Sequence, residues 1–395
     1  MKTLVALACF LIVSMVLSAQ SGPDYNAIAD KIVKHSLEVK PGEVVIITGT
    51  SAEEDLMAAL LVAVSKAGGK PYIQLTIPYA NKRAAMETPI KYLKIPSAYP
   101  LIQARAADCF INTVSTQDPA LFKDVPEDRL AAIRQSNLPY QSALSRVRNR
   151  NVSLGQTGGI PSQAYASYKG ADYEDLVYMF WQSVDTDYQK IHDRGTFIST
   201  LIKPGSELNV TGKAGTNLTI KVADQPARLN CGQCAENISA SGAASVWLPA
   251  GEVYVCTNPT SANGTIVIPS MTYRGHIIKN LTLTLQNGHI TDLKADENAA
   301  ILQESLDKST GDKDVLSVVD IGLNPDSHPL KGSDYYSWEM GGMITLYIGN
   351  NTWAGGNIES DIGIALHLAN SSISIDGKQI VSNGILKLPE PLAKK

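Results

Sequence analysis

Two cysteines spaced by two residues are the part of this sequence whose types and spacing most directly suggest chemistry. Cys231 and Cys234 form a CxxC pattern, and Glu252 and Cys256 follow nearby. Such a pair can be a redox centre, half of a zinc site or a tight disulfide. A thioredoxin-type redox pair needs a strand before it and a helix after it, whereas the surrounding residues predict loop and strand. We therefore favour a structural disulfide or a pair of inert thiols.

The charge of the chain argues against a nucleic-acid partner. Its 395 residues include 34 Lys and Arg and 38 Asp and Glu, a formal net charge of −4, and the pI is about 5.9. Phosphate binding depends mainly on clustered Lys and Arg, and the short alternation of Arg146, Arg148 and Arg150 is better interpreted as a solvated face. The 44% of hydrophobic residues can form a sizeable core, and the length favours two domains.

The first residues predict a leader rather than a part of the fold. Lys2 is followed by a run of small and apolar residues over Thr3–Leu17 and then by Ser18-Ala19-Gln20. This is the layout of a signal peptide, and the run is shorter than the roughly 20 apolar residues of a spanning helix. We expect residues 1–19 to be removed near Ala19 and the protein to be secreted or periplasmic. No second segment is apolar enough to span a membrane, so we expect no membrane contact after cleavage.

The first half of the chain predicts an α/β domain with a parallel sheet. Val44–Ile47 is a short apolar run of the kind buried in such a sheet, and Tyr72–Thr76 predicts the next strand. A helix lies between them, with Ser51 and Glu54 as its expected capping box. The connection has crossover length, so we expect the two strands to be parallel.

From about residue 200 the pattern changes to short β-branched runs, which include Ala244–Leu248. Within Leu281–Leu293, a central Asn-Gly predicts a hairpin with a type I′ turn. A second hairpin is expected over Ser372–Val381, turning at its Asp-Gly. The sequence thus predicts an α/β domain over residues 20–200, followed by a mainly antiparallel, barrel-like (α+β) domain over residues 201–395.

A series of short motifs occurs in a fixed order in the second half: Leu248–Val253 (LPAGEV), Asn263–Ile268 (NGTIVI), Gly322–Pro325 (GLNP), Gly355–Asn357 (GGN) and Ile375–Lys378 (IDGK). In that order they resemble the aminopeptidase T family of metallopeptidases, which includes the aminopeptidase S type. The resemblance covers about residues 25 to 388. It implies an exopeptidase that removes N-terminal residues from peptides, with two divalent ions that activate a bound water. It also implies a homodimer that closes around a cavity.

The metal ligands that this resemblance implies are mostly absent. The first glutamate is present as Glu252, but the second aligns with Val318 and a histidine aligns with Thr345. The final H-x-D motif aligns with Gly363 and Ala365. A single carboxylate does not hold a d-block ion usefully, because affinity comes from converging ligands. We therefore expect no metal cofactor in a degenerate member of the family, and zinc, cobalt or manganese only if the enzyme is active.

Two functions remain open from the sequence. One is an aminopeptidase-like protein with little or no peptidase activity that binds a peptide, a small molecule or another partner. Aromatic residues gather where the resemblance places the site, and they could form a binding surface or fill the space as core. These residues are Tyr335, Tyr336, Trp338, Tyr347 and Trp353.

The alternative is an active metallo-aminopeptidase with an altered ligand set. Asp320 is the nearest acid to the Val318 position, although a shift of two residues moves a side chain by about 7 Å along a strand. The acids Asp334, Glu339, Glu359 and Asp361 are otherwise explained by surface solvation. The residues that could form an altered site are Glu252, Asp320, Glu339, Glu359, Asp361 and His367.

Overall fold

The computed structural model describes residues 22–144, 147–156, 158–238 and 244–393. The expected signal peptide of residues 1–19 lies outside this part of the chain. Within the described ranges, no helix is both long and apolar enough to cross a membrane.

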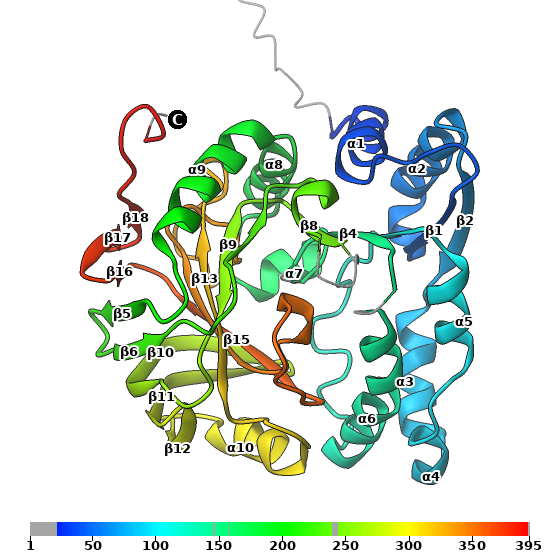
Figure 1. Ribbon diagram of the computed structural model, residues 1–395. Coiled ribbons are helices and arrows are strands. Elements are labelled where there is room, and N and C mark those ends of the chain that lie inside the picture. Colours follow the sequence, from blue (N-terminus) through cyan, green and yellow to red (C-terminus); the bar gives the residue numbers. More distant parts are fainter. Residues whose placement is uncertain (1–21, 145–146, 157, 239–243, 394–395) are drawn as a thin grey trace, which may run out of the picture.

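Helices are concentrated in the first half of the chain (Figure 1). They are α1 (Tyr25–Lys31), α2 (Glu54–Lys66), α3 (Pro78–Glu87), α4 (Ile90–Leu93), α5 (Tyr99–Ala106), α6 (Glu127–Leu144), α7 (Gln163–Tyr168), α8 (Tyr173–Val184), α9 (Tyr188–Leu201) and α10 (Ala299–Lys308). Among the described residues after position 201, α10 is the only α-helix, and it packs against α6. This contact ties the two halves of the molecule together.

A parallel sheet forms the first half, as the sequence predicts. Its strand order is β2 (Lys70–Leu75), β1 (Val44–Gly49), β3 (Cys109–Asn112), β4 (Arg150–Leu154) and β8 (Ala244–Leu248). The expected parallel pairing of β1 with β2 is confirmed. One assignment was wrong, because Ala244–Leu248 pairs in parallel with β4 instead of joining the antiparallel strands around it in sequence.

The turn after β1 is capped one residue earlier than the sequence suggests. The reciprocal hydrogen bonds of the capping box join Thr50 and Glu53, whereas Ser51 and Glu54 were expected to do so. A short 3₁₀ turn over Ser51–Glu53 precedes α2 and shifts the cap. The Glu53 carboxylate is buried and receives hydrogen bonds from the Thr50 backbone and hydroxyl.

The second half is antiparallel, as expected, and forms two sheets. The larger has the order β12 (His289–Lys294), β11 (His276–Gln286), β10 (Asn263–Tyr273), β6 (Asn217–Lys221), β5 (Glu207–Gly212), β16 (Ser371–Ile375), β17 (Lys378–Ser382) and β18 (Ile385–Leu386). The smaller has the order β15 (Gly363–Leu368), β14 (Ile344–Gly349), β13 (Leu316–Gly322), β9 (Glu252–Cys256) and β7 (Arg228–Asn230). Across the described strands both sheets are open, so the barrel-like closure expected from the sequence is not formed.

Both predicted hairpins are confirmed. Asn287 and Gly288 have φ values of 48° and 86°, as the type I′ turn requires. Alternate residues of the smaller sheet, such as Val253, Val319 and Leu346, join residues of the larger sheet in one apolar core. The other face of the smaller sheet is therefore free to carry different side chains.

Candidate functional site

One row of side chains crosses four strands on that other face. Tyr254 on β9 lies opposite Asp320 on β13, Asp320 lies opposite Thr345 on β14, and Thr345 lies opposite His367 on β15. Directly opposed residues of an antiparallel pair point to the same side of the sheet. The register therefore gathers an acid, a hydroxyl and an imidazole that are far apart in sequence.

A second row runs beside the first. It consists of Cys256, Val318, Tyr347 and Ala365. Glu252 lies two residues before Tyr254 on β9 and so shares this face. The positions at which the family resemblance implies metal ligands thus belong to a single surface of the sheet.

Asp320 and Glu252 are buried acids with incomplete hydrogen bonding. Asp320 is 0% exposed, and neither of its carboxylate oxygens has a hydrogen-bond partner among the described residues. Glu252 accepts a hydrogen bond of 3.4 Å from Asn230, while its Oε1 atom has no hydrogen-bond partner in the described ranges. Burial raises the pKa of both groups well above the ordinary values, and the charges of nearby acids raise the two pKa values further.

Glu339 is the third acid of this group, and the expectation that it is a solvated surface residue was wrong. It is buried, and its carboxylate accepts hydrogen bonds from Ser327 at 2.9 Å and Ser337 at 2.5 Å. Burial raises its pKa as well. Asp361 is also buried, with its Oδ1 atom accepting from the Thr310 backbone at 2.7 Å. In the described ranges no three His, Cys, Asp or Glu side chains are arranged to hold a metal ion.

Aromatic rings fill the space beside these rows. We call Trp247, Tyr254, Trp338, Tyr347 and Trp353 the aromatic cluster. Trp353 lies at its centre, with its ring centroid 5.5 Å from those of Trp247 and Tyr347, 5.4 Å from that of Tyr254 and 5.9 Å from that of Trp338. These separations and the mostly edge-on angles are typical of packed aromatic pairs. Burial raises the pKa of Tyr347 to about 12.

Tyr347 occupies the space in front of Gly363. A Cβ atom added at Gly363 would overlap the hydroxyl oxygen and ring of Tyr347. Tyr347 is itself held between Trp338, at 5.6 Å, and Trp353, at 5.5 Å. A side chain at position 363 would therefore have to displace a packed ring.

The five aromatic residues singled out from the sequence do not form one surface. Trp338, Tyr347 and Trp353 belong to the aromatic cluster, whereas Tyr335 is buried elsewhere against Tyr165, with 6.2 Å between ring centroids. Tyr336 is half-buried and lines a cavity. Their role in binding stays a prediction.

That cavity has a volume of about 270 Å³ and opens on the same face of the smaller sheet. Its lining includes Gln156, Lys169, Asp334, Trp338 and His367, together with the Gly363 and Ala365 positions. An adjoining cavity of about 300 Å³ shares Asp334, Tyr336 and His367. The site region is thus hollow beside the aromatic cluster, with Trp338 of the cluster forming part of the cavity wall.

The charged groups of this cavity are few. Burial lowers the pKa of the Lys169 ammonium, and the Asp334 carboxylate partly opposes this shift. Burial and the charge of Lys169 lower the pKa of His367 to about 3, so its imidazole is neutral at pH 7. His367 Nδ1 and the Thr345 hydroxyl form a hydrogen bond of 2.9 Å. The cavity therefore offers one cation, one anion and neutral polar groups.

The four cysteines in the described part of the chain are buried and not joined by disulfides. Cys231 follows strand β7, but Cys234 begins only a three-residue 3₁₀ turn, so the α-helix that a thioredoxin-type redox pair needs does not follow at these described residues. Burial raises the pKa of Cys231 to about 11 and that of Cys234 to about 12. Both shifts disfavour the reactive thiolate. A structural disulfide or an inert thiol pair stays a prediction.

Several residues of the region were not found from the sequence. Tyr254 could have been, because it lies two residues after Glu252 and a strand alternates with period two. Gln156 and Lys169 come from the first half, which has no local signal that would place them here. Gln156 lines the cavity, and it also opposes the rise in the pKa of Glu252 that burial causes.

Comparisons with known proteins bear on the family and the fold of this chain. The family model described as thermophilic metalloprotease (M29) matches residues 23–334. Aminopeptidase AmpS of Bacillus subtilis is 22% identical over 316 residues, which are 72% of this chain and 74% of that protein. The solved structure of AmpT from Thermus thermophilus matches with a TM-score of 0.71 and 14% identity, over 92% of this chain and 99% of that chain. The solved structure of 2,5-dihydroxypyridine dioxygenase from Pseudomonas putida matches with a TM-score of 0.55 and 16% identity, over 94% of this chain and 98% of that chain. The chain therefore belongs to the thermophilic metalloprotease family.

Proposed function

We propose that this protein keeps the aminopeptidase fold but has lost the two-metal site, and that it binds a peptide or another small molecule with little or no hydrolysis. The activity that the relatives' names give, that of an aminopeptidase, depends in this family on metal. The side chains at the positions where the resemblance implies metal ligands therefore decide whether this chain can hold the metals.

The observation that carries the proposal is the pairing of Gly363 with Tyr347. The resemblance implies a histidine at position 363, where this chain has no side chain, and the Tyr347 ring takes up the space that such a side chain would need. The ring is clamped by two tryptophans, so it does not swing away at low cost. Such complementary filling is what a vacated site would acquire.

The remaining positions support the same conclusion. Val318 packs among apolar and aromatic side chains with Tyr254, Cys256 and Ala354. The Thr345 hydroxyl is engaged in a hydrogen bond with His367. A pair of divalent ions needs several converging donors, so the residues present do not fit the family's metals.

The cavity beside the cluster supports a binding role. Lys169 and Asp334 both line it, and their charges match the carboxylate and the ammonium group of a short peptide. Trp338 and Tyr336 add flat apolar walls, which suit a peptide side chain.

Peptide hydrolysis and peptide binding test this proposal side by side. Wild-type protein should give no turnover of leucine or alanine p-nitroanilide above the metal-only blank with zinc, cobalt or manganese, and Glu252→Ala should behave identically. A dipeptide should bind wild-type protein, as followed by tryptophan fluorescence, and should bind Lys169→Gln several-fold more weakly, while Lys331→Gln serves as the matched control. Turnover that disappears in Glu252→Ala overturns the proposal.

One observation favours a second candidate, an active metallo-aminopeptidase with an altered ligand set. Both oxygens of Asp320 and the Oε1 atom of Glu252 are buried without hydrogen-bond partners from the described part of the chain, and buried polar groups are normally satisfied. A cation between them would satisfy these atoms. The hydrolysis assay separates the two candidates, because Asp320→Asn would then abolish turnover together with Glu252→Ala.

We also propose that the chain is exported and that residues 1–19 are removed. The charged start, the apolar run and the small residues before position 20 support this proposal. N-terminal sequencing of protein from an exporting host should begin at Gln20 or within a few residues of it. A retained Met1 contradicts it.

A further inference from the structure

A separate cavity lies in the first half of the molecule, at the carboxyl ends of the parallel strands. Its volume is about 560 Å³, and it shares no lining residue with the cavity beside the aromatic cluster. The loops that form it follow β1, β2 and β3 directly, at Thr50–Ala52, Thr76–Tyr79 and Val114–Pro119.

The topology makes this a favourable place for a ligand. In the sheet, β1 lies between β2 and β3. The chain therefore runs from β1 to β2 in one direction across the sheet and continues from β3 in the other. The loops after β1 and β3 lie on either side of this reversal, at the carboxyl ends of the strands. In open α/β sheets, ligands bind in the crevice outside the carboxyl ends of the strands at such a switch point.

Buried polar contacts fix two of these loops. The Glu53 carboxylate holds Thr50 of the first loop, and it also accepts a hydrogen bond from Ser115 of the third. Gln117 donates to the Ser115 hydroxyl at 2.5 Å. The cavity floor is therefore preformed and needs no ligand to order it.

Its walls are apolar and incompletely covered by the described chain. Leu75, Ile77 and Tyr79 line the cavity and are 55%, 58% and 65% exposed. Phe122 and Leu130 complete the apolar lining. Contiguous exposed apolar side chains around a hollow are typical of a binding site.

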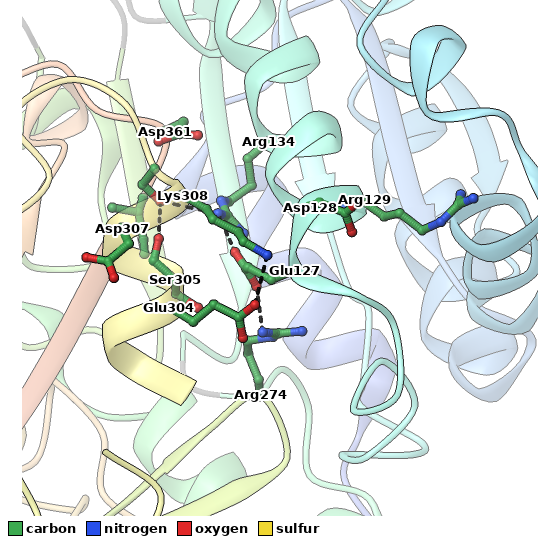
Figure 2. Close-up of polar contacts among 12 residues, drawn as sticks. Glu127, Asp128, Arg129, Arg134, Arg274, Glu304, Ser305, Asp307, Lys308 and Asp361 are labelled. Carbon is green, nitrogen blue, oxygen red and sulfur yellow. Dashed lines mark hydrogen bonds and ion pairs between the residues drawn. The ribbon is translucent and has the colours of Figure 1, made fainter. Parts of the chain in front are cut away.

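The rim carries an excess of positive charge. Arg274 lines the cavity, and Figure 2 shows its guanidinium beside Glu127, which also binds Arg134. The Glu127 carboxylate lies 2.6 Å from the guanidinium of Arg274 and 2.7 Å from that of Arg134, so a single negative charge is shared by two arginines. Lys123 lines the same cavity and forms no ion pair with any described residue.

The pKa of a neighbouring histidine agrees with this charge balance. Lys123 and Arg274 both lower the pKa of His276, after burial as the larger cause. Asp118 is the acid on the cavity wall, and its Oδ1 atom is engaged by the Ala120 backbone at 2.9 Å. The local field therefore favours an anion at the rim.

We propose that this cavity binds a small carboxylic acid with an apolar body, the body lying against Leu75, Ile77 and Phe122 and the carboxylate facing Lys123 and Arg274. The same chemistry is presented by a free aryl- or alkyl-carboxylic acid and by the apolar carboxyl terminus of a peptide. This site is independent of the function proposed for the other cavity, so either proposal can fail alone.

Calorimetric titration of the full chain tests the site with matched probes. 4-Phenylbutyrate represents the free acid and acetyl-Leu-Phe the peptide terminus, and 4-phenylbutanol and acetyl-Leu-Phe-amide are their uncharged counterparts. At least one acid should bind about fivefold more tightly than its uncharged counterpart. The acid that binds more tightly shows whether the natural ligand is a free carboxylic acid or the carboxyl terminus of a peptide. Equal or no binding of both acids and their counterparts overturns the proposal.

Substitutions then locate the bound acid. Lys123→Gln should weaken binding about three- to fivefold, and Ile77→Asp, which puts a negative charge on the wall, should weaken it more than tenfold. The controls are Lys203→Gln and Ile385→Asp, because these side chains are also exposed but lie away from the cavity. Binding that is unchanged in both cavity variants places the acid elsewhere and contradicts the inference.

Discussion

Adding a single methyl group at Gly363 tests whether the space of the family's ligand is filled. The new Cβ atom of Gly363→Ala would overlap the Tyr347 hydroxyl and ring. Gly363 is an ordinary strand residue of β15 without a positive φ, so no backbone strain complicates the change. The clash must be relieved by moving Tyr347 against Trp338 and Trp353.

The expected cost follows from two opposing effects. Overpacking a tight site costs about 1–3 kcal/mol, while Gly→Ala stabilises by about 0.4–1 kcal/mol through the unfolded chain. The net loss of unfolding free energy for Gly363→Ala should be about 1–2 kcal/mol. In urea this corresponds to a midpoint lower by roughly 0.5 M.

A double-mutant cycle assigns that cost to Tyr347. Tyr347→Ala removes the ring, and in that background Gly363→Ala should cost nothing or stabilise, which gives a coupling of about 1–3 kcal/mol. Equilibrium urea unfolding followed by circular dichroism measures all four proteins. Gly22→Ala is the control, because no atom of the described residues lies within 4 Å of a Cβ placed there. The reasoning is refuted if Gly363→Ala is as stable as the wild type, or if it costs the same in both backgrounds.

Three further predictions concern buried groups. The raised pKa of Asp320 means that the folded state favours the protonated carboxyl group. The stability that this protonation contributes is complete below the pKa of the unfolded chain. It is lost at about 1.4 kcal/mol per pH unit as pH rises from there through the folded pKa. Asp320→Asn should therefore melt above the wild type at pH 8, with a smaller difference at pH 5, and a lower melting temperature at pH 8 would contradict this. Glu127→Gln should lower the free energy of unfolding, measured by thermal unfolding, by about 3–5 kcal/mol, because Arg134 and Arg274 would lose the carboxylate that they share. The control is Asp128→Asn, which changes an exposed acid, and equal losses in the two variants would reject the explanation. The four cysteines of the described chain should resist a thiol reagent until unfolding and then all react without reductant, since burial raises their pKa values to about 11–12; only two reacting would reveal a disulfide.

Local sequence signals predicted the elements that depend on neighbouring residues. The apolar run at Val44–Ile47 and the crossover after it led to a parallel pair. The Asn287-Gly288 turn led to a hairpin because both residues adopt positive φ at low cost. The strand at Ala244–Leu248 was misplaced, because its partner β4 is remote in sequence and no local pattern selects it.

The candidate site was predicted less completely, because it depends on burial and strand register. The resemblance assigned positions that do share one sheet face, including Val318 and Thr345. Glu339 was interpreted as a surface acid, since its sequence neighbours do not reveal the serines that hold it in the interior. Lys169 reaches the cavity from the first half, and only the tertiary fold brings it to His367.

Metal content tests the central claim most directly. The purified protein would be equilibrated with zinc, cobalt or manganese, desalted and measured by mass spectrometry, beside Glu252→Ala. We expect far less than one ion per chain and no difference between the two proteins. Retention of about two ions per chain by the wild type, lost in Glu252→Ala, would contradict the account and restore the protein to the active metallopeptidases.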